Sequence, residues 1–522
     1  MSSLAAPPPI ASAAAVFCGR YGDVTRLARS RGVFRQTLYR EAHFVARALR
    51  PRSLPTVVTS LRSQVAQLRA EVARLQQQLR DAVVLDSDRQ AAFAAHAQAV
   101  GVSLSSAHIL LGVLLGPAAP SVSQLGRFAQ QAGRCATPIL ATLDDCARAR
   151  AKQVAADEMF VGKKPVLMTI DQPSLCWLGG RLAESRDGPQ WQREFAQLPA
   201  AEQVTRDGGQ GMEKGLKMVN AARQQSGRAA IADQEDHFHI LYRGRRGLRE
   251  VRAKASRALR KAEKAQATFR RDRRQRPLGG GRASALARCW RRAEQAFDRW
   301  SAQEKAFERL RAGLRLFTTA GELNTPQQAE AEVRAALAEL TGPEWSRLRT
   351  RLVGPKAFTF LFRVQQQLAA LPVTAELREA AVTVEGLRRQ PESPRGEGQA
   401  ARALRGVLLA CGVVLSLAGA VGEQARTLVH GVLSGAWRSS SLVEGLNSVL
   451  RMQQRRQKRL TQGLLDLKRL YWNCHVFAAG RRKGQKPYER LGVVLPPDEW
   501  WQLLKKTPEQ LRDQLSELNQ AA

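Results

Sequence analysis

Two aspartates follow or lie within β-prone segments in the middle of this chain. Asp157 lies inside the apolar run 154–161, and Asp207 directly follows the run 203–206, fifty residues after Asp157. Two carboxylates a few ångströms apart repel each other unless a cation lies between them, and Mg²⁺ prefers oxygen ligands. The pattern indicates a magnesium site. The alternative, an Asp that only begins a glycine-rich turn, stays open.

The elements that would position these aspartates are the strands of one sheet. The sequence predicts strands over 154–161, 165–170 and 175–178, a helix over 189–198, and further strands over 203–206 and 228–232. An acidic residue in the first strand and a second at the end of the fourth resembles the order in a ribonuclease H-like sheet. In such a sheet the two carboxylates lie side by side.

A third acidic residue, Glu444, lies in a predicted amphipathic helix with a serine at its start. At 100° per residue, the apolar positions share one face and the polar positions share the opposite face. The apolar set is Leu442, Leu446, Val449 and Leu450, and the polar set is Glu444, Asn447, Ser448 and Arg451. Such a helix can pack on a sheet and project Glu444 sideways to a metal. An ordinary amphipathic surface helix has the same pattern.

Asp236 and His239 follow the predicted fifth strand and are separated by two residues. They could place an imidazole beside the metal or hold a loop by hydrogen bonds. A His-x-His pair is more often structural than ligating, and no third ligand is visible nearby. Both residues are therefore expected next to the metal ligands and not as ligands.

The charge of the chain favours a polyanionic partner. Its 522 residues contain 82 Lys and Arg against 46 Asp and Glu, a formal charge of +36. The basic residues are spread along the chain, which indicates extended contact with nucleic acid. Density is highest over 243–276, so Arg243, Arg245 and Arg246 are candidate phosphate contacts. A ribosomal or RNA-packaging protein would share this bias.

Cysteine usage and hydropathy bear on the compartment. The seven cysteines are far apart with no C-x-x-C pair, which argues against a zinc ribbon or a disulfide framework and is typical of a reducing cytoplasm. The most apolar run, 407–421, is short for a membrane span and is expected to be a buried helix.

The N-terminal segment 24–42 has the pattern of a helix, a glycine turn and a second helix. Arg35, Gln36 and Arg40 are expected to face outward on the second helix. Arg and Gln make bidentate contacts to base edges, so a DNA-reading helix-turn-helix is indicated. A basic helical hairpin with no DNA role remains the alternative.

Two more helical regions follow. An alternating spacing of four and three residues predicts a coiled coil, and hence self-association, along Leu61, Val65, Leu68, Val72, Leu75 and Leu79. A solitary surface helix is the alternative. Residues 121–144 are expected to form a second helix-turn-helix-like module, with Gly133 closing one helix and Pro138 opening the next.

Together these motifs resemble those of DDE transposases. The matching stretches are 156–160, 204–209, 236–239 and 440–448 with Arg451. The chain is similar to transposases of bacterial insertion sequences, and in layout to the Mutator-like and hAT groups. The resemblance implies an α/β ribonuclease H-like core with a mixed five-stranded sheet, a large all-α insertion and an N-terminal helical DNA-binding region.

The expected domains follow from this layout. They are a helix-turn-helix (1–50), a coiled coil (51–90), a second helical module (91–150), the first part of the core (151–240), the helical insertion (241–430), the second part of the core with the glutamate helix (431–495) and a helical tail (496–522).

The resemblance also assigns roles. It implies that Asp157, Asp207 and Glu444 are the catalytic carboxylates and hold two Mg²⁺ ions, with Mn²⁺ a possible substitute. Asp236, His239, Asn447 and Arg451 would support them, and Asp171, at the end of the second strand, is the reserve for the first carboxylate. The implied reaction is cleavage at the ends of the element and transfer of the 3′-hydroxyl into target DNA.

The resemblance further implies double-stranded DNA as partner, a homodimer or higher oligomer, no membrane, and a nucleoid-associated location in a bacterial cytoplasm. Two other functions stay open. One is a structure-specific nuclease on the same sheet, which cuts but does not join. The other is a non-catalytic basic DNA-binding coiled-coil protein.

Overall fold

The structure, a computed structural model, forms two compact units, Met1–Asp86 and Ser87–Ala522, and each is described by itself. The residues described are 8–49, 54–81, 85–275, 280–318, 320–352, 354–389, 399–454 and 460–521. The chain is mostly helical, at 72% of residues, with one five-stranded sheet. A flexible linker expected over 390–398 lies outside the described residues.

The first unit begins with three short helices: α1 (Pro8–Phe17), α2 (Asp23–Arg31) and α3 (Arg35–Ala48). Helix α2 ends at Gly32, whose φ of 63° lies in the left-handed region that glycine adopts without strain. Leu38 and Ala42 bury one side of α3. The predicted helix, glycine turn and second helix are therefore confirmed as local structure.

Helix α4 (Leu54–Asp81) follows in the same unit as one continuous helix. Its apolar stripe is exposed: Leu61, Leu68 and Leu75 are 52%, 65% and 49% exposed, and Val65 and Val72 are 46% and 51% exposed. The side chain of Leu79 lies outside the described part. Over the residues described, the stripe thus lacks cover from the rest of the first unit.

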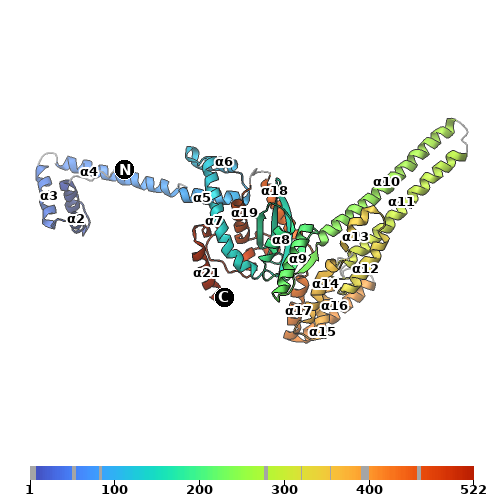
Figure 1. Cartoon of the computed structure of the whole chain (residues 1–522). Coiled ribbons are helices and arrows are strands. Elements are labelled where there is room, and N and C mark those ends of the chain that lie inside the picture. The colour runs from blue at the N-terminus through green and yellow to red at the C-terminus, as the bar shows by residue number, and fades with distance from the viewer. Residues whose placement is uncertain are drawn as a thin grey trace. The chain divides into compact units, whose positions relative to one another are not determined.

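The sheet of the second unit has the order β3-β2-β1-β4-β5 (Figure 1). The strands are β1 (Gln153–Val161), β2 (Lys164–Asp171), β3 (Trp177–Leu182), β4 (Gln203–Arg206) and β5 (Ala232–Glu235). Strands β1, β2 and β3 pair antiparallel, whereas β4 pairs parallel to β1, and β5 parallel to β4. The prediction of a mixed five-stranded sheet is confirmed.

The fifth strand was placed wrongly by the sequence. It runs over Ala232–Glu235 and not over 228–232. Its polar residues are paired: Asp233 binds Arg206 at 2.6 Å, Glu235 binds Arg351 at 3.2 Å, and Gln234 accepts from the backbone N–H of Phe360 at 2.8 Å. Partners from the distant insertion make this polar strand stable, and a local β-prone pattern cannot reveal them.

The two faces of the sheet are covered differently. One face packs on helices α5 (Ser87–Val100), α7 (Val122–Arg148), α8 (Gly188–Ala196), α9 (Gln210–Gln225), α19 (Gln462–Cys474) and α21 (Pro508–Ala521). Helix α6 (Leu104–Leu115) packs on α7, and the short α20 (Pro487–Arg490) packs on α19. The opposite face carries α18 (Ser441–Gln454), through Val443, Leu446 and Leu450. Because successive strand residues alternate between faces, Asp157 points toward the α18 side.

The expected second helix-turn-helix is absent from residues 121–144, which form the continuous helix α7 with Pro138 inside it. Gly133 does not end a helix. A Cβ at Gly133 would lie 2.8 Å from the backbone carbon of Gly463, so the glycine permits close approach of α7 and α19. Packing of the buried face against α19 outweighs the hydrogen bond lost at proline.

The all-helical insertion predicted over 241–430 corresponds, in the residues described, to a series of α-helices between β5 and α18. They are α10 (His237–Gln275), α11 (Gly280–Gly313), α12 (Pro326–Glu339), α13 (Ser346–Leu352), α14 (Thr359–Ala369), α15 (Ala375–Arg388), α16 (Gln399–Leu417) and α17 (Gly419–Ser434). Helices α10–α14 share one apolar core and α14–α17 share a second. Helices α10 and α11 form a long antiparallel hairpin (Figure 1).

The apolar run 407–421 is not the buried helix that its composition predicts. It is divided between α16 and α17 by Gly419, which has a φ of 56°. Leu409 and Leu417 are 71% and 84% exposed, whereas Leu415 is buried. None of the described helices is individually long and apolar enough to cross a membrane. One pair bent by 118°, Leu104–Ala118 with Val122–Arg148, meets the length and composition criteria together.

We predict that Gly133→Ala destabilises the second unit, because the added methyl group meets the backbone of Gly463. The expected loss in the free energy of unfolding is about 1–3 kcal/mol, the usual cost of overpacking. Chemical denaturation monitored by circular dichroism measures it. The matched control is Gly112→Ala in α6, where the methyl group meets open space. Equal stability of the two variants would contradict the close approach of α7 and α19.

Candidate active site

Three aspartates lie level with one another where the parallel strands end. In the register, Ala156 of β1 pairs with Arg206 of β4, and Arg206 pairs with Glu235 of β5. The next residue of each segment is Asp157, Asp207 and Asp236, respectively. Parallel strands end at the same edge of a sheet, so the topology brings these three carboxylates together.

Asp157 is almost fully buried, with 6% of its surface exposed. Its Oδ2 accepts a hydrogen bond from Asn447 Nδ2 at 2.7 Å, and its Oδ1 accepts from the backbone N–H of Glu158 at 2.8 Å. Burial, followed by the charges of Glu444 and Asp207, raises the pKa of Asp157 to about 7. The repulsion identifies Asp207 and Glu444 as electrostatic neighbours of Asp157.

Glu444 is carried to this edge by α18. The helix buries Val443, Leu446 and Leu450 against the sheet, which leaves Glu444 partly exposed beside it. Its Oε1 lies 3.8 Å from His239 Nε2, and its Oε2 lies 3.8 Å from a guanidinium nitrogen of Arg451. The Glu444 carboxylate, from the second part of the core, therefore lies at the same edge of the sheet as Asp157 and Asp207, which come from the first part.

The buried face of α18 differs from the one predicted. Asn447 was expected on the polar outer face but is fully buried, and Val443 is buried in place of Leu442 and Val449. The helix is rotated because the amide of Asn447 turns inward to donate to Asp157. The hydrogen bond to Asp157 offsets the cost of burying the amide nitrogen, and a pattern of apolar residues cannot reveal such a bond.

The segment before α18 is fixed by hydrogen bonds to its backbone carbonyl oxygens. The carbonyl of Trp437 accepts from Gln203 Nε2 at 2.9 Å, that of Arg438 from the N–H of His237 at 2.9 Å, and that of Ser439 from Gln172 Nε2 at 2.8 Å. These donors come from the strands or the segments next to them. They hold the segment in front of Glu444 against the sheet.

Asp236 and His239 form a hydrogen-bonded pair in the first turn of α10. His239 Nδ1 lies 2.5 Å from Asp236 Oδ2, and the same oxygen accepts from Ser440 Oγ at 2.6 Å. The hydrogen bond to Asp236 raises the pKa of His239, with the charges of Asp207 and Asp157 acting in the same direction. The imidazole thus lies within electrostatic reach of the carboxylates and is oriented by Asp236.

Asp207 is placed by a tight glycine turn. Its Oδ1 accepts from the backbone N–H of Gly209 at 2.8 Å. A Cβ at Gly208 would overlap the guanidinium of Arg351, which donates to the carbonyl oxygen of Gly208. A side chain at position 208 would therefore displace the guanidinium of Arg351 from its present position.

Asp171, the reserve candidate, lies apart from this group. It pairs with Val154 in the register, on the other face of the sheet from Asp157. Its Oδ2 accepts from the hydroxyl and backbone N–H of Ser174, at 2.6 and 3.0 Å. Burial raises its pKa, and the neighbours that act on it are Ser174 and Arg490. The geometry favours Asp157 over Asp171 as the partner of Asp207.

Four arginines lie near the carboxylates, and three of them, Arg186, Arg347 and Arg351, were missed by the sequence analysis. The charge of Asp207 acts on Arg186, which is paired with Glu158, and on the half-buried Arg243. Burial lowers the pKa of Arg243, and Arg351 and Arg347 act in the same direction. Arg243 was a candidate by charge density alone. Arg347 and Arg351 lie in the insertion with no motif around them, so no local signal could have found them.

The other predicted DNA contacts lie on exposed surfaces. Arg245 and Arg246 are exposed on α10, and Arg246 pairs with Glu250 at 3.4 Å. In the first unit, Arg35, Gln36 and Arg40 are exposed on α3, as expected for a recognition helix. Nothing in the structure assigns any of them to DNA.

The donor set suits a hard divalent cation. Carboxylate oxygens from Asp157, Asp207 and Glu444 approach one region, and their mutual repulsion is the condition that a cation relieves. Among the residues that the structure describes, no three His, Cys, Asp or Glu side chains are closed into a ready metal-binding group.

Comparisons of the chain with known protein families, with curated proteins and with solved structures give no match.

We predict that Glu444→Gln lowers the pKa of Asp157 from about 7, because it removes the larger of the two repelling charges. Carbon-13 NMR titration of labelled aspartate carboxyls, in buffer without divalent ions, measures the change. Asp207→Asn should lower the pKa less. The control, Glu202→Gln, lies at the opposite end of β4 and should leave the pKa unaltered.

The same shift has a consequence for stability. The pKa of Asp157 in the folded chain is above its ordinary value of about 4, so the protonated carboxyl stabilises the fold at low pH. This contribution is lost as the pH rises through about 7.

An Asp157 pKa that stays unaltered in the Glu444→Gln variant would contradict the predicted interaction between the Asp157 and Glu444 carboxylates.

Proposed function

We propose that this chain is a DDE transposase, an enzyme that cuts DNA at the ends of a mobile element and joins the freed 3′-hydroxyl to target DNA. The observation that carries the proposal is the meeting of Asp157, Asp207 and Glu444 at one edge of the sheet, where burial, and after it the charges of Glu444 and Asp207, raise the pKa of Asp157. The strand order β3-β2-β1-β4-β5, with β4 and β5 parallel to β1, supports a ribonuclease H-like core.

Magnesium ions held by the three carboxylates would activate the attacking oxygen and stabilise the leaving oxygen of a phosphodiester. The residues around them maintain the geometry. Asn447 fixes one orientation of Asp157, and Asp236 orients the ring of His239 so that Nε2 faces Glu444. Arg243 and Arg351, close to Asp207, supply positive charge for phosphate oxygens.

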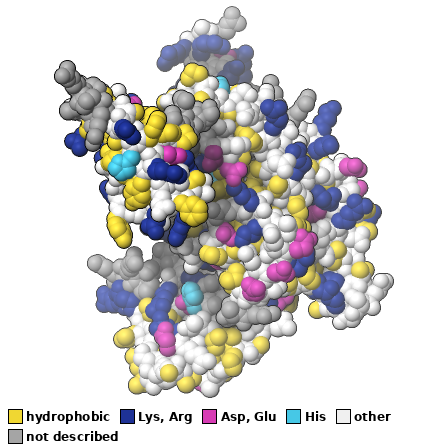
Figure 2. Space-filling model, turned by 90° about the vertical axis from the view of Figure 1, so that its left-hand side faces the viewer, with side chains coloured by type: hydrophobic (Ala, Val, Ile, Leu, Met, Phe, Trp, Pro, Cys, Tyr) yellow, Lys and Arg dark blue, Asp and Glu magenta, His cyan; other side chains and the backbone are white. Residues whose placement is uncertain are grey.

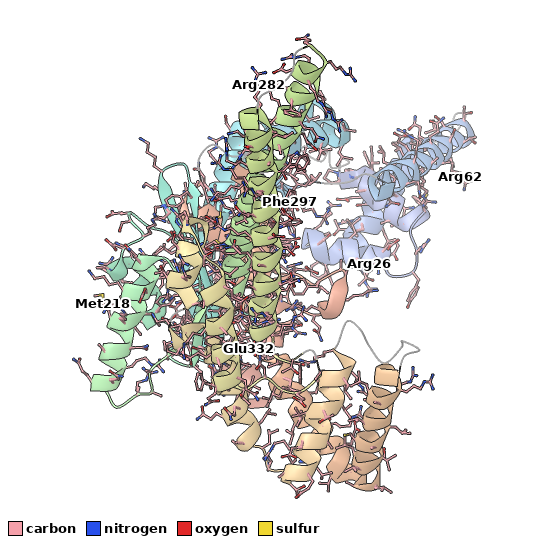
Figure 3. The ribbon with its side chains drawn as sticks, turned by 90° about the vertical axis from the view of Figure 1, so that its right-hand side faces the viewer. Arg26, Arg62, Met218, Arg282, Phe297 and Glu332 are labelled. Carbon is pink, nitrogen blue, oxygen red and sulfur yellow. The ribbon has the colours of Figure 1, made fainter. Side chains whose placement is uncertain are left out.

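The surface charge suits extended contact with double-stranded DNA. Lys and Arg side chains are spread over the visible face in Figure 2, with Asp and Glu among them. The α10–α11 hairpin adds a basic arm: past Ala262 and Ala293 no described residue of either helix is buried. Arg282 marks its tip in Figure 3. The basic residues of the arm include Arg270, Arg271, Arg273, Arg274, Arg288, Arg291 and Arg292. Such an arm can follow a DNA backbone through phosphate contacts.

Self-association through α4 fits the same function. Valines 58, 65 and 72 occupy the a positions of the heptads, and leucines 61, 68 and 75 occupy the d positions. Valine at a with leucine at d favours a parallel two-stranded coiled coil. Arg62 and Arg69 occupy e positions, where an antiparallel pair would place arginine against arginine. The proposed dimer is therefore parallel and brings two copies of α1–α3 to the same end.

We predict that Asp157→Ala, Asp207→Ala and Glu444→Ala each bind DNA but lose cleavage by at least about 100-fold, because the cation site needs all three carboxylates. Mg²⁺-dependent nicking of labelled element ends, with binding measured separately, tests this. Glu202→Gln and Asp171→Asn should retain cleavage. Normal nicking by any of the three alanine variants would refute the assignment, and loss with Asp171→Asn alone would move the first carboxylate to Asp171.

A strand-transfer assay separates the transposase from a nuclease on the same sheet. A pre-cut DNA end with a free 3′-hydroxyl should be joined to a plasmid target by the wild-type chain and not by Glu444→Ala. Nicking without joining would support the nuclease. Metal-independent binding with neither reaction would leave only a DNA-binding coiled-coil protein.

We predict that Leu68→Lys converts the dimer to monomers in sedimentation equilibrium, because a charge at a d position cannot be buried in the seam. Ala70→Lys, at an outer position, is the matched control and should leave the dimer intact. Orientation is tested by Leu61→Cys, which should form a disulfide between copies under oxidising conditions only if the helices are parallel. A dimer unaffected by Leu68→Lys would show that α4 is not the interface.

A further inference from the structure

A hollow of about 270 Å³ lies beside the candidate active site. Its wall is formed by the start of α10, the end of α11 and the segment before α18. The residues that line it are His237, Phe238, Leu241, Arg311, Leu314, Arg315, Arg438 and Ser439. We refer to it as the arginine pocket.

The arginine pocket shares two walls with the candidate active site. Phe238 lines the pocket, whereas its neighbours in the chain, Asp236 and His239, belong to the carboxylate group. Likewise Ser439 lines the pocket, and the next residue, Ser440, donates to Asp236. The pocket and the candidate active site are therefore built on the same two segments, the start of α10 and the segment before α18.

The pocket is positively charged. Three arginines line it and no acidic residue does. Arg311 is paired with Glu308 of its own helix at 2.6 Å, but Arg315 has no ion pair among the residues described. The guanidinium of Arg438 donates to the carbonyl oxygen of Leu314 at 2.5 Å. Burial lowers the pKa of Arg438, and the charge of Arg315 acts in the same direction. Two guanidiniums that repel each other in a hollow favour an anion between them.

An aromatic side chain lies at the same place. Phe238 is 44% exposed although it lines the pocket, and its ring packs edge-on against His239 at 5.4 Å between centroids. Tyr242, one turn further along α10, stacks beside it and is 52% exposed. An exposed ring next to a cationic hollow is the combination that binds an unpaired base and its phosphate.

We propose that the arginine pocket binds one unpaired nucleotide of the DNA strand next to the cleaved phosphodiester, with its phosphate between Arg315 and Arg438 and its base against Phe238. The proposal rests on the proposed function, since it assumes a DNA substrate at the carboxylates. A hollow of this size can admit a single nucleotide but not a paired duplex. Enzymes that act on DNA gain selectivity when such a nucleotide leaves the stack.

The test compares two DNA duplexes of the same sequence, one fully paired and one with a single extrahelical nucleotide. Fluorescence anisotropy with the full chain, in EDTA so that no cleavage occurs, measures the affinity for each. The wild-type chain is expected to prefer the extrahelical nucleotide by about fivefold or more, the effect of one stacked base. Arg315→Gln and Phe238→Leu should each remove most of this preference while binding the paired duplex normally.

Matched controls lie elsewhere on the insertion. Phe362 in α14 is also 44% exposed, and Arg334 in α12 is exposed and paired with Glu330. Phe362→Leu and Arg334→Gln should keep the preference. Both pocket residues are partly exposed, so their substitution should leave the fold intact, which circular dichroism checks.

Each other outcome has one meaning. DNA binding without preference in the wild type, or a preference that survives both pocket substitutions, overturns the pocket and leaves the proposed transposase standing. Loss with Arg315→Gln but not with Phe238→Leu overturns the contact with the base. Absence of all DNA binding overturns the pocket and the proposed function together. Cleavage by the carboxylate variants would overturn the proposed catalytic site and, with it, the position of the nucleotide next to the cleaved bond, whereas the preference for an extrahelical nucleotide is measured independently of cleavage.

Discussion

Burial of the Asp157 carboxyl beside two further carboxylates, at one edge of the sheet, is the constraint on which the candidate site depends. Asp157 is buried beside Glu444 and Asp207, and in the absence of a cation its proton is retained up to a pH of about 7. A fold that did not need these charges would be more stable without them. The strand register holds Asp157 and Asp207 at this edge, and the packing of α18 on the sheet holds Glu444 beside them.

The supporting hydrogen bonds connect parts of the chain that are far apart in sequence. Asn447 reaches Asp157 across 290 positions, and Ser440 reaches Asp236 across 204. The insertion contributes from the other side, because Arg351 binds both Glu235 and the carbonyl oxygen of Gly208. The helices of the insertion therefore fix the turn after β4 and the last strand, in addition to separating the two parts of the core.

Positive charge is distributed in accordance with these roles. Near the carboxylates, arginines are partly buried and held by specific partners, as Arg351 and Arg438 are. Along the basic arm of α10 and α11, most arginine side chains are exposed to solvent. The first kind can hold a phosphate at a defined position, whereas the second attracts a polyanion without fixing its register. Both kinds are consistent with the proposed substrate.

The sequence by itself determined the presence of the first four strands and of the helical insertion, that an acid lies in the first strand and another after the fourth, and that α4 has an apolar heptad stripe. These features depend on local periodicity and turn residues, which neighbouring positions encode. Only the tertiary structure decided that Pro138 lies inside a helix, that β5 is a polar strand, and that α18 turns Asn447 toward Asp157. Each of these features depends on a partner that is distant in the sequence, such as Gly463 for α7 or Arg206 for β5. Such partners leave no pattern among neighbouring residues, so local periodicity cannot predict them.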